Sequence, residues 1–124
     1  MTVTRLHLCL AGLLGAIGVV LLAAGSHSGG ELLTTAGQIL LFHAPVIIAA
    51  TVARKSGHLG VLTSQWGLAL LILGSVIFAA NLVLLHGFGA RLFPFAAPSS
   101  GVMMILGWLV LAASAFFSKP DPVA

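Results

Sequence analysis

The stretch Thr34–Ala53, TTAGQILLFHAPVIIAATVA, decides the fold of this chain. Its length of about 20 residues, with no Asp, Glu, Lys or Arg, is that of a helix crossing the hydrocarbon core of a bilayer. His43 lies near its middle, roughly 13 Å from its start at about 1.5 Å per residue. An ionisable side chain at that depth is costly, so His43 is the first candidate for a functional residue.

The composition of the whole chain agrees with a membrane protein. Of 124 residues, 60% are hydrophobic and 6% are charged, and the mean hydropathy is +1.20. Soluble domains carry about 25% charged residues, so a water-soluble fold is excluded. The net charge of +3 comes from Lys and Arg spread over the ends of apolar runs. Because no basic face results, nucleic acid is not expected as a partner.

Four apolar runs predict an all-α bundle of four transmembrane helices in one integral membrane domain, 1–124. The first run is longer than the apolar region of a signal peptide, so we interpret it as a retained helix. The segment 86–101 is rich in Gly, Pro and Phe and is predicted to form an aromatic loop at the membrane interface. The expected spans are approximately 6–24, 34–53, 62–85 and 101–118.

The positive charges predict an orientation. Four of them fall at one end of such a bundle, namely Arg5, Arg54, Lys55 and Lys119, and only Arg91 falls at the other. The excess of Lys and Arg marks the cytoplasmic side, so we expect both termini in the cytoplasm.

Small residues are expected where the helices touch, because close approach of the backbones drives helix association in lipid. Gly12, Gly15 and Gly18 recur every third residue, and Gly67 and Gly74 lie seven apart. The residues predicted to pack helix on helix are Gly12, Gly15, Gly18, Gly67, Gly74 and Gly107.

His43 shares a seven-residue spacing with Ala36 and Ala50, which places it on a face of small side chains that points into the bundle. We expect a neutral, buried imidazole that forms hydrogen bonds within the bundle, since no acidic residue lies in the apolar runs. The intramembrane polar residues Gln38 and Asn81 and the carbonyl that Pro45 frees are its expected partners. The alternative is a proton carrier near the midplane.

Other sites receive less support. His27, Glu31 and His86 would share the outer surface and are a conceivable metal-ligand set, but their spacing is not diagnostic. A haem held by two histidines is not expected, because only His43 is central, while His86 lies at the outer end and His7 and His58 lie at the inner end. No nucleophile–base pair or phosphate loop is present. We therefore expect no metal, no cofactor and no enzymatic activity.

Several short elements resemble those of the YgdD-like family, small bacterial inner-membrane proteins of unknown function with four predicted spans. The elements are Gly25-Ser26-His27, Thr35-Ala36…Gln38…His43-Ala44, Gly74…Phe78 and Gly101…Gly107-Trp108-Leu109. The resemblance implies a multi-pass protein of the bacterial inner membrane and brings no activity with it.

The sequence thus predicts a structural or accessory membrane component. Its expected partners are the lipid bilayer and either another membrane protein or further copies of itself. A small transporter or proton-conducting element that uses His43 is the alternative.

Overall fold

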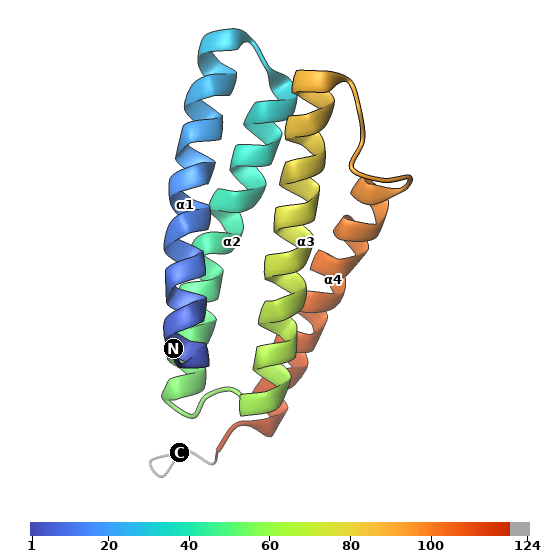
Figure 1. Cartoon of the computed structure of the whole chain (residues 1–124). Helices are drawn as coiled ribbons and strands as arrows, with labels where there is room; N and C mark the ends of the chain where they lie inside the picture. The colour runs from blue at the N-terminus through green and yellow to red at the C-terminus, as the bar shows by residue number, and fades with distance from the viewer. Residues whose placement is uncertain (120–124) are drawn as a thin grey trace.

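The computed structural model describes residues 1–119; residues 120–124, which include Asp121 and most of the polar tail, lie outside it. The described chain forms four long helices and a terminal 3-10 turn. These are α1 (Val3–Ser28), α2 (Glu31–Lys55), α3 (Val61–Phe88), α4 (Ala96–Ser114) and η1 (Ala115–Phe117). The helices run alternately up and down, so α1 begins at the same end of the bundle at which η1 ends (Figure 1).

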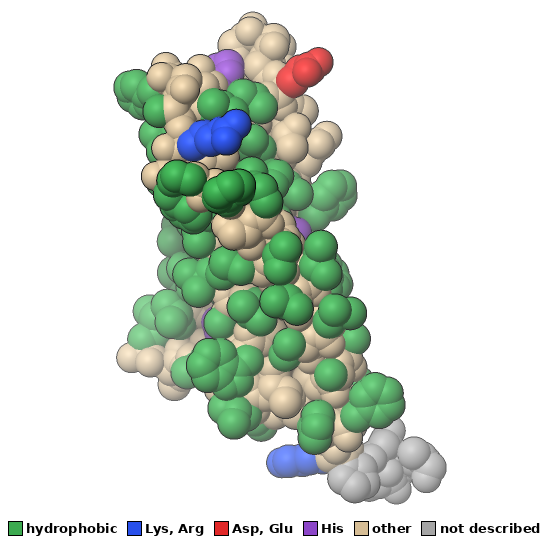
Figure 2. Space-filling view, turned by 90° about the vertical axis from the view of Figure 1, so that its right-hand side faces the viewer, with side chains coloured by type: hydrophobic (Ala, Val, Ile, Leu, Met, Phe, Trp, Pro, Cys, Tyr) green, Lys and Arg blue, Asp and Glu red, His purple; other side chains and the backbone are tan. Residues whose placement is uncertain are grey.

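The fold is an all-α bundle of a multi-pass membrane protein. All four helices are long and apolar enough to cross a membrane. Figure 2 shows one face, on which hydrophobic side chains cover the middle and charged side chains lie towards the two ends. Exposed aromatic side chains also stand near the ends, at the depth where such residues meet lipid headgroups. They are Trp66, Phe88, Phe93, Phe95, Phe116 and Phe117.

The loop between α3 and α4 is shorter than the sequence predicts. The expectation of a loop over 86–101 is wrong at both ends, because α3 continues to Phe88 and α4 begins at Ala96. Gly89 ends α3 in the left-handed backbone conformation, with a φ of 65°. Gly29 ends α1 in the same way, with a φ of 69°. Pro98 lies in the first turn of α4, where a backbone N–H has no partner in the helix, so proline does not break it.

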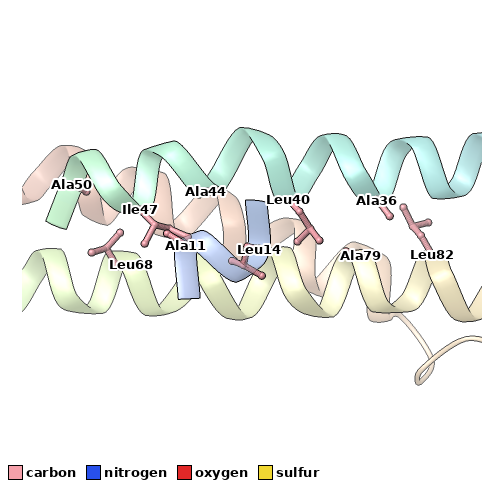
Figure 3. Close-up of a cluster of buried hydrophobic side chains, with 10 residues drawn as sticks. All are labelled: Ala11, Leu14, Ala36, Leu40, Ala44, Ile47, Ala50, Leu68, Ala79 and Leu82. Carbon is pink, nitrogen blue, oxygen red and sulfur yellow. The ribbon is translucent and has the colours of Figure 1, made fainter. Parts of the chain in front are cut away.

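The helix α2 forms the centre of the bundle. It packs on α1 and on α3, while α4 packs on α3. The buried cluster in Figure 3 accordingly takes half of its side chains from α2, with α1 and α3 supplying the rest. Its members are Ala11, Leu14, Ala36, Leu40, Ala44, Ile47, Ala50, Leu68, Ala79 and Leu82.

Glycines bring α3 and α4 into near-backbone contact. A Cβ atom built on Gly67 would lie 3.2 Å from the carbonyl oxygen of Gly107, and one built on Gly107 would lie 3.0 Å from that of Gly67. About two turns further along α3, a Cβ atom built on Gly74 would lie 2.9 Å from the backbone carbonyl oxygen of Ser100. These three glycines therefore lie at the helix contact expected for them, and any larger side chain would separate the helices.

The contact between α1 and α2 uses a different pair. A Cβ atom on Gly37 would lie 2.8 Å from the carbonyl oxygen of Gly18. Gly15 is looser, with 3.7 Å to the Ala44 Cβ, and Gly12 has nothing within 4 Å. The expectation that Gly12 packs on a neighbouring helix is thus wrong. Gly12 and Gly18 are six residues apart, which places them about 120° apart around the helix. Gly12 therefore does not lie on the face of α1 that holds Gly18.

Candidate functional site

His43 lies in the middle of α2 and faces the interior of the bundle. Its side chain is 6% exposed, and Ala36 and Ala50 are buried on the same face. The seven-residue spacing explains this arrangement, since residues seven apart lie almost in line along a helix. The small side chains on either side leave the imidazole within reach of the other helices.

Both ring nitrogens of His43 have partners. Nδ1 lies 2.8 Å from the carbonyl oxygen of Ile39. A carbonyl oxygen only accepts hydrogen bonds, so Nδ1 carries the hydrogen and donates. Nε2 lies 3.3 Å from Nε1 of Trp108 in α4, whose indole N–H only donates, so Nε2 accepts. Both bonds fit the neutral Nδ1–H tautomer; the bond to Ile39 lies within α2, and the bond to Trp108 joins α2 to α4.

The partners of His43 differ from those expected from the sequence. Gln38 is exposed on the outside of the bundle. Asn81 is buried, but its Oδ1 accepts a hydrogen bond of 3.0 Å from the Leu92 backbone N–H and so fixes the α3–α4 loop. The carbonyl that accepts the hydrogen bond from His43 belongs to Ile39. The carbonyl that Pro45 leaves without its helical donor belongs to Leu41. All three expected partners are therefore wrong.

Trp108 is the partner of His43 that the sequence reasoning missed. Its ring centroid lies 6.0 Å from that of His43, with the planes tilted by 58°. One signal pointed to it: an indole N–H inside a membrane needs an acceptor, and a mid-helix histidine supplies one.

A second polar cluster, also missed, lies at the end of the bundle where α1 begins. Arg54, near the end of α2, is only 5% exposed. Its Nη1 lies 3.2 Å from His7 Nδ1, and its Nη2 donates to Thr4 Oγ1 at 3.3 Å. A guanidinium has no acceptor, so it donates to His7 as well, and the Nδ1 of His7 is unprotonated. Arg54 had entered the sequence interpretation only as one of the charges that set the orientation.

The three candidate metal ligands lie at the opposite end, around the turn between α1 and α2. His27 and Glu31 are exposed, and the imidazole of His86 packs against Gly30, where a Cβ atom would lie 2.8 Å from the His86 Cε1. Within residues 1–119 no group of three His, Cys, Asp or Glu is placed to hold a metal ion. The fold therefore does not bring these three side chains together as a metal site.

Comparison of the chain with protein-family models, with curated proteins and with solved structures gives no match in any of the three. The resemblance to the YgdD-like family accordingly stays a prediction.

Proposed function

We propose that this protein is a structural or accessory component of the bacterial inner membrane, without catalytic activity of its own. The observation that carries the proposal is the double engagement of His43, between the Ile39 carbonyl and the Trp108 indole. A polar side chain fixed in this way holds helices together, as hydrogen bonds between transmembrane helices do elsewhere. The role of the imidazole is to connect α2 and α4.

A proton-conducting role for His43 is the alternative, because the ring lies at mid-membrane depth. Uptake of a proton would place a hydrogen on Nε2 and remove the acceptor that the Trp108 N–H uses. The only acidic side chain within residues 1–119 is Glu31, the first residue of α2. The imidazolium would therefore lose a hydrogen bond without gaining a carboxylate partner, which disfavours a relay of protons through this ring.

Proton flux into vesicles distinguishes the two roles. The purified protein is reconstituted with a pH-sensitive dye inside and a potassium diffusion potential across the membrane. We expect the same flux for wild type, His43→Asn and His43→Leu, with His43→Asn the more stable variant because an amide retains a donor and an acceptor. A flux in the wild-type vesicles that His43→Asn abolishes, while the folded content is unchanged, would overturn the proposal in favour of transport.

The proposal includes an orientation with both termini in the cytoplasm. It is supported by the position of Arg5, Arg54, Lys55 and Lys119 near the end of the bundle where α1 begins, while Arg91 lies in the loop at the other end. Reporter fusions test it in bacterial cells. Fusions after Gly29 and Gly89 should be active outside, and a fusion after Ser56 should be active inside; an external signal from Ser56 reverses the orientation.

A further inference from the structure

The end of the bundle that holds Arg54 contains a polar cavity of about 470 Å³. The α2–α3 loop, the first turns of α1 and α3, and the chain after η1 surround it. Its walls include Thr4, Arg54, Lys55, Gln65 and Lys119. Three of the five Lys and Arg side chains of the protein thus border one cavity.

The charge of Arg54 has no counter-ion within the described chain. Its two hydrogen-bond partners, His7 and Thr4, are neutral. Glu31, the only acid among residues 1–119, lies 23 residues earlier in α2, about 35 Å away along the helix axis. A buried cation without an anion is unfavourable, so an anion bound in the cavity would stabilise the folded protein.

The backbone adds further positive potential. Helix α3 begins beside the cavity at Val61, and its cap residue Gly60 has no side chain to bond the first N–H groups. The N-terminus of a helix carries a partial positive charge and attracts anions. Here it supplements a buried guanidinium and two ammonium groups that border the same space.

The chain after η1 is held in place, which positions Lys119. The Lys119 N–H donates to the Gly57 carbonyl at 2.9 Å, and the Gly60 N–H donates to the Ser114 carbonyl at 2.9 Å. Phe117 packs on the same loop, since a Cβ atom on Gly60 would lie 2.7 Å from the Phe117 Cβ. The backbone of Lys119 is therefore a fixed part of the cavity wall.

We propose that this cavity binds the phosphate group of an anionic phospholipid. Arg54 is the buried anchor, and Lys55 and Lys119 are the exposed cations beside it. The depth favours a lipid over phosphate in solution, because Phe117 in the cavity wall and Trp66 nearby in α3 are largely exposed, as aromatic residues at the headgroup level are. Basic pockets on the cytoplasmic side of transmembrane bundles bind such headgroups. This inference rests on the proposed orientation, in which this end of the bundle is cytoplasmic, and does not depend on the role of His43.

Native mass spectrometry of the full-length protein in detergent tests the proposal. The probes are dioleoyl phosphatidylglycerol, dioleoyl phosphatidylcholine and inorganic phosphate, each titrated separately. We expect the wild type to bind phosphatidylglycerol more tightly than phosphatidylcholine. The variant Lys55→Gln/Lys119→Gln keeps both hydrogen bonds of Arg54 and should bind phosphatidylglycerol about 25-fold more weakly, at about fivefold per lysine.

Two matched controls locate the site. Arg5→Gln removes an exposed charge at the same end that does not border the cavity, and Arg91→Gln removes one at the other end; both should bind the anionic lipid as the wild type does. Equal affinity for the two lipids would overturn the proposal. So would an equal loss in Arg5→Gln and in the double lysine variant, or a phosphate ion that displaces phosphatidylglycerol at matched concentration.

Discussion

Replacing Gly37 by alanine is the sharpest test of how α1 and α2 are held together. The new Cβ atom would lie 2.8 Å from the Gly18 carbonyl oxygen and 2.9 Å from the Leu22 backbone nitrogen. Ordinary contacts of a Cβ atom begin at 3.4 Å, so the first distance falls short by 0.6 Å. Both atoms belong to the backbone of α1 and have no rotamer with which to move aside. The two helices must therefore separate at this crossing.

The expected cost follows from that separation. Inserting a methyl group into a closely packed interior costs about 1–3 kcal/mol, and a gap of about 0.5–1 Å removes a quarter to a half of the dispersion energy of the neighbouring contacts. Alanine also favours a helix over glycine by up to about 1 kcal/mol, which offsets part of this. We expect Gly37→Ala to lower the free energy of unfolding by about 1–2 kcal/mol.

Gly12→Ala is the matched control. It makes the same chemical change inside a neighbouring helix, at a position with nothing within 4 Å. Its free energy of unfolding should equal or slightly exceed that of the wild type. Both variants are unfolded by titrating sodium dodecyl sulfate into mild-detergent micelles and followed by circular dichroism. Equal midpoints for Gly37→Ala and Gly12→Ala would refute the proposed close contact between α1 and α2.

Two further predictions concern the hydrogen bonds. Trp108→Phe removes the donor to His43 Nε2 and should lower the free energy of unfolding by about 0.6–1.7 kcal/mol, between the average and the largest value for such bonds in membranes. The same titration measures it, and an unchanged midpoint would mean that the bond contributes nothing. Asn81→Ala removes the acceptor of the Leu92 N–H, so hydrogen exchange at Leu92 should accelerate. An unchanged exchange rate there would show that the loop is held by other contacts.

The sequence was sufficient for the number, order and alternation of the helices. Long apolar runs have few alternatives in a membrane, since a backbone in lipid must satisfy its hydrogen bonds within a helix or a closed barrel. The ends of the helices were less certain because polar and glycine residues extend them beyond the apolar run. Thus α3 continues through His86 and Gly87 to Phe88.

The faces of the helices could not be predicted as well as their existence. In a soluble protein the apolar side chains mark the buried face of a helix. In lipid they occupy both faces, so hydrophobic periodicity no longer shows which face is buried. Gln38 was placed inside and is exposed, whereas Arg54 was assigned only to one end of the bundle and is buried. His43 was placed correctly within the bundle because its neighbours at seven-residue spacing are alanines, a signal of size and not of polarity.

The pairing of the helices also bears on how the chain enters the membrane during synthesis. The glycine contacts join α1 to α2 and α3 to α4, so each tight pair is a hairpin of consecutive segments. The first hairpin has all of its own contact residues by Lys55, before any of α3 is translated. Each of the two helix pairs can therefore form as soon as its own two helices are inserted. The hydrogen bond from Trp108 in α4 to His43 in α2 then joins the two pairs.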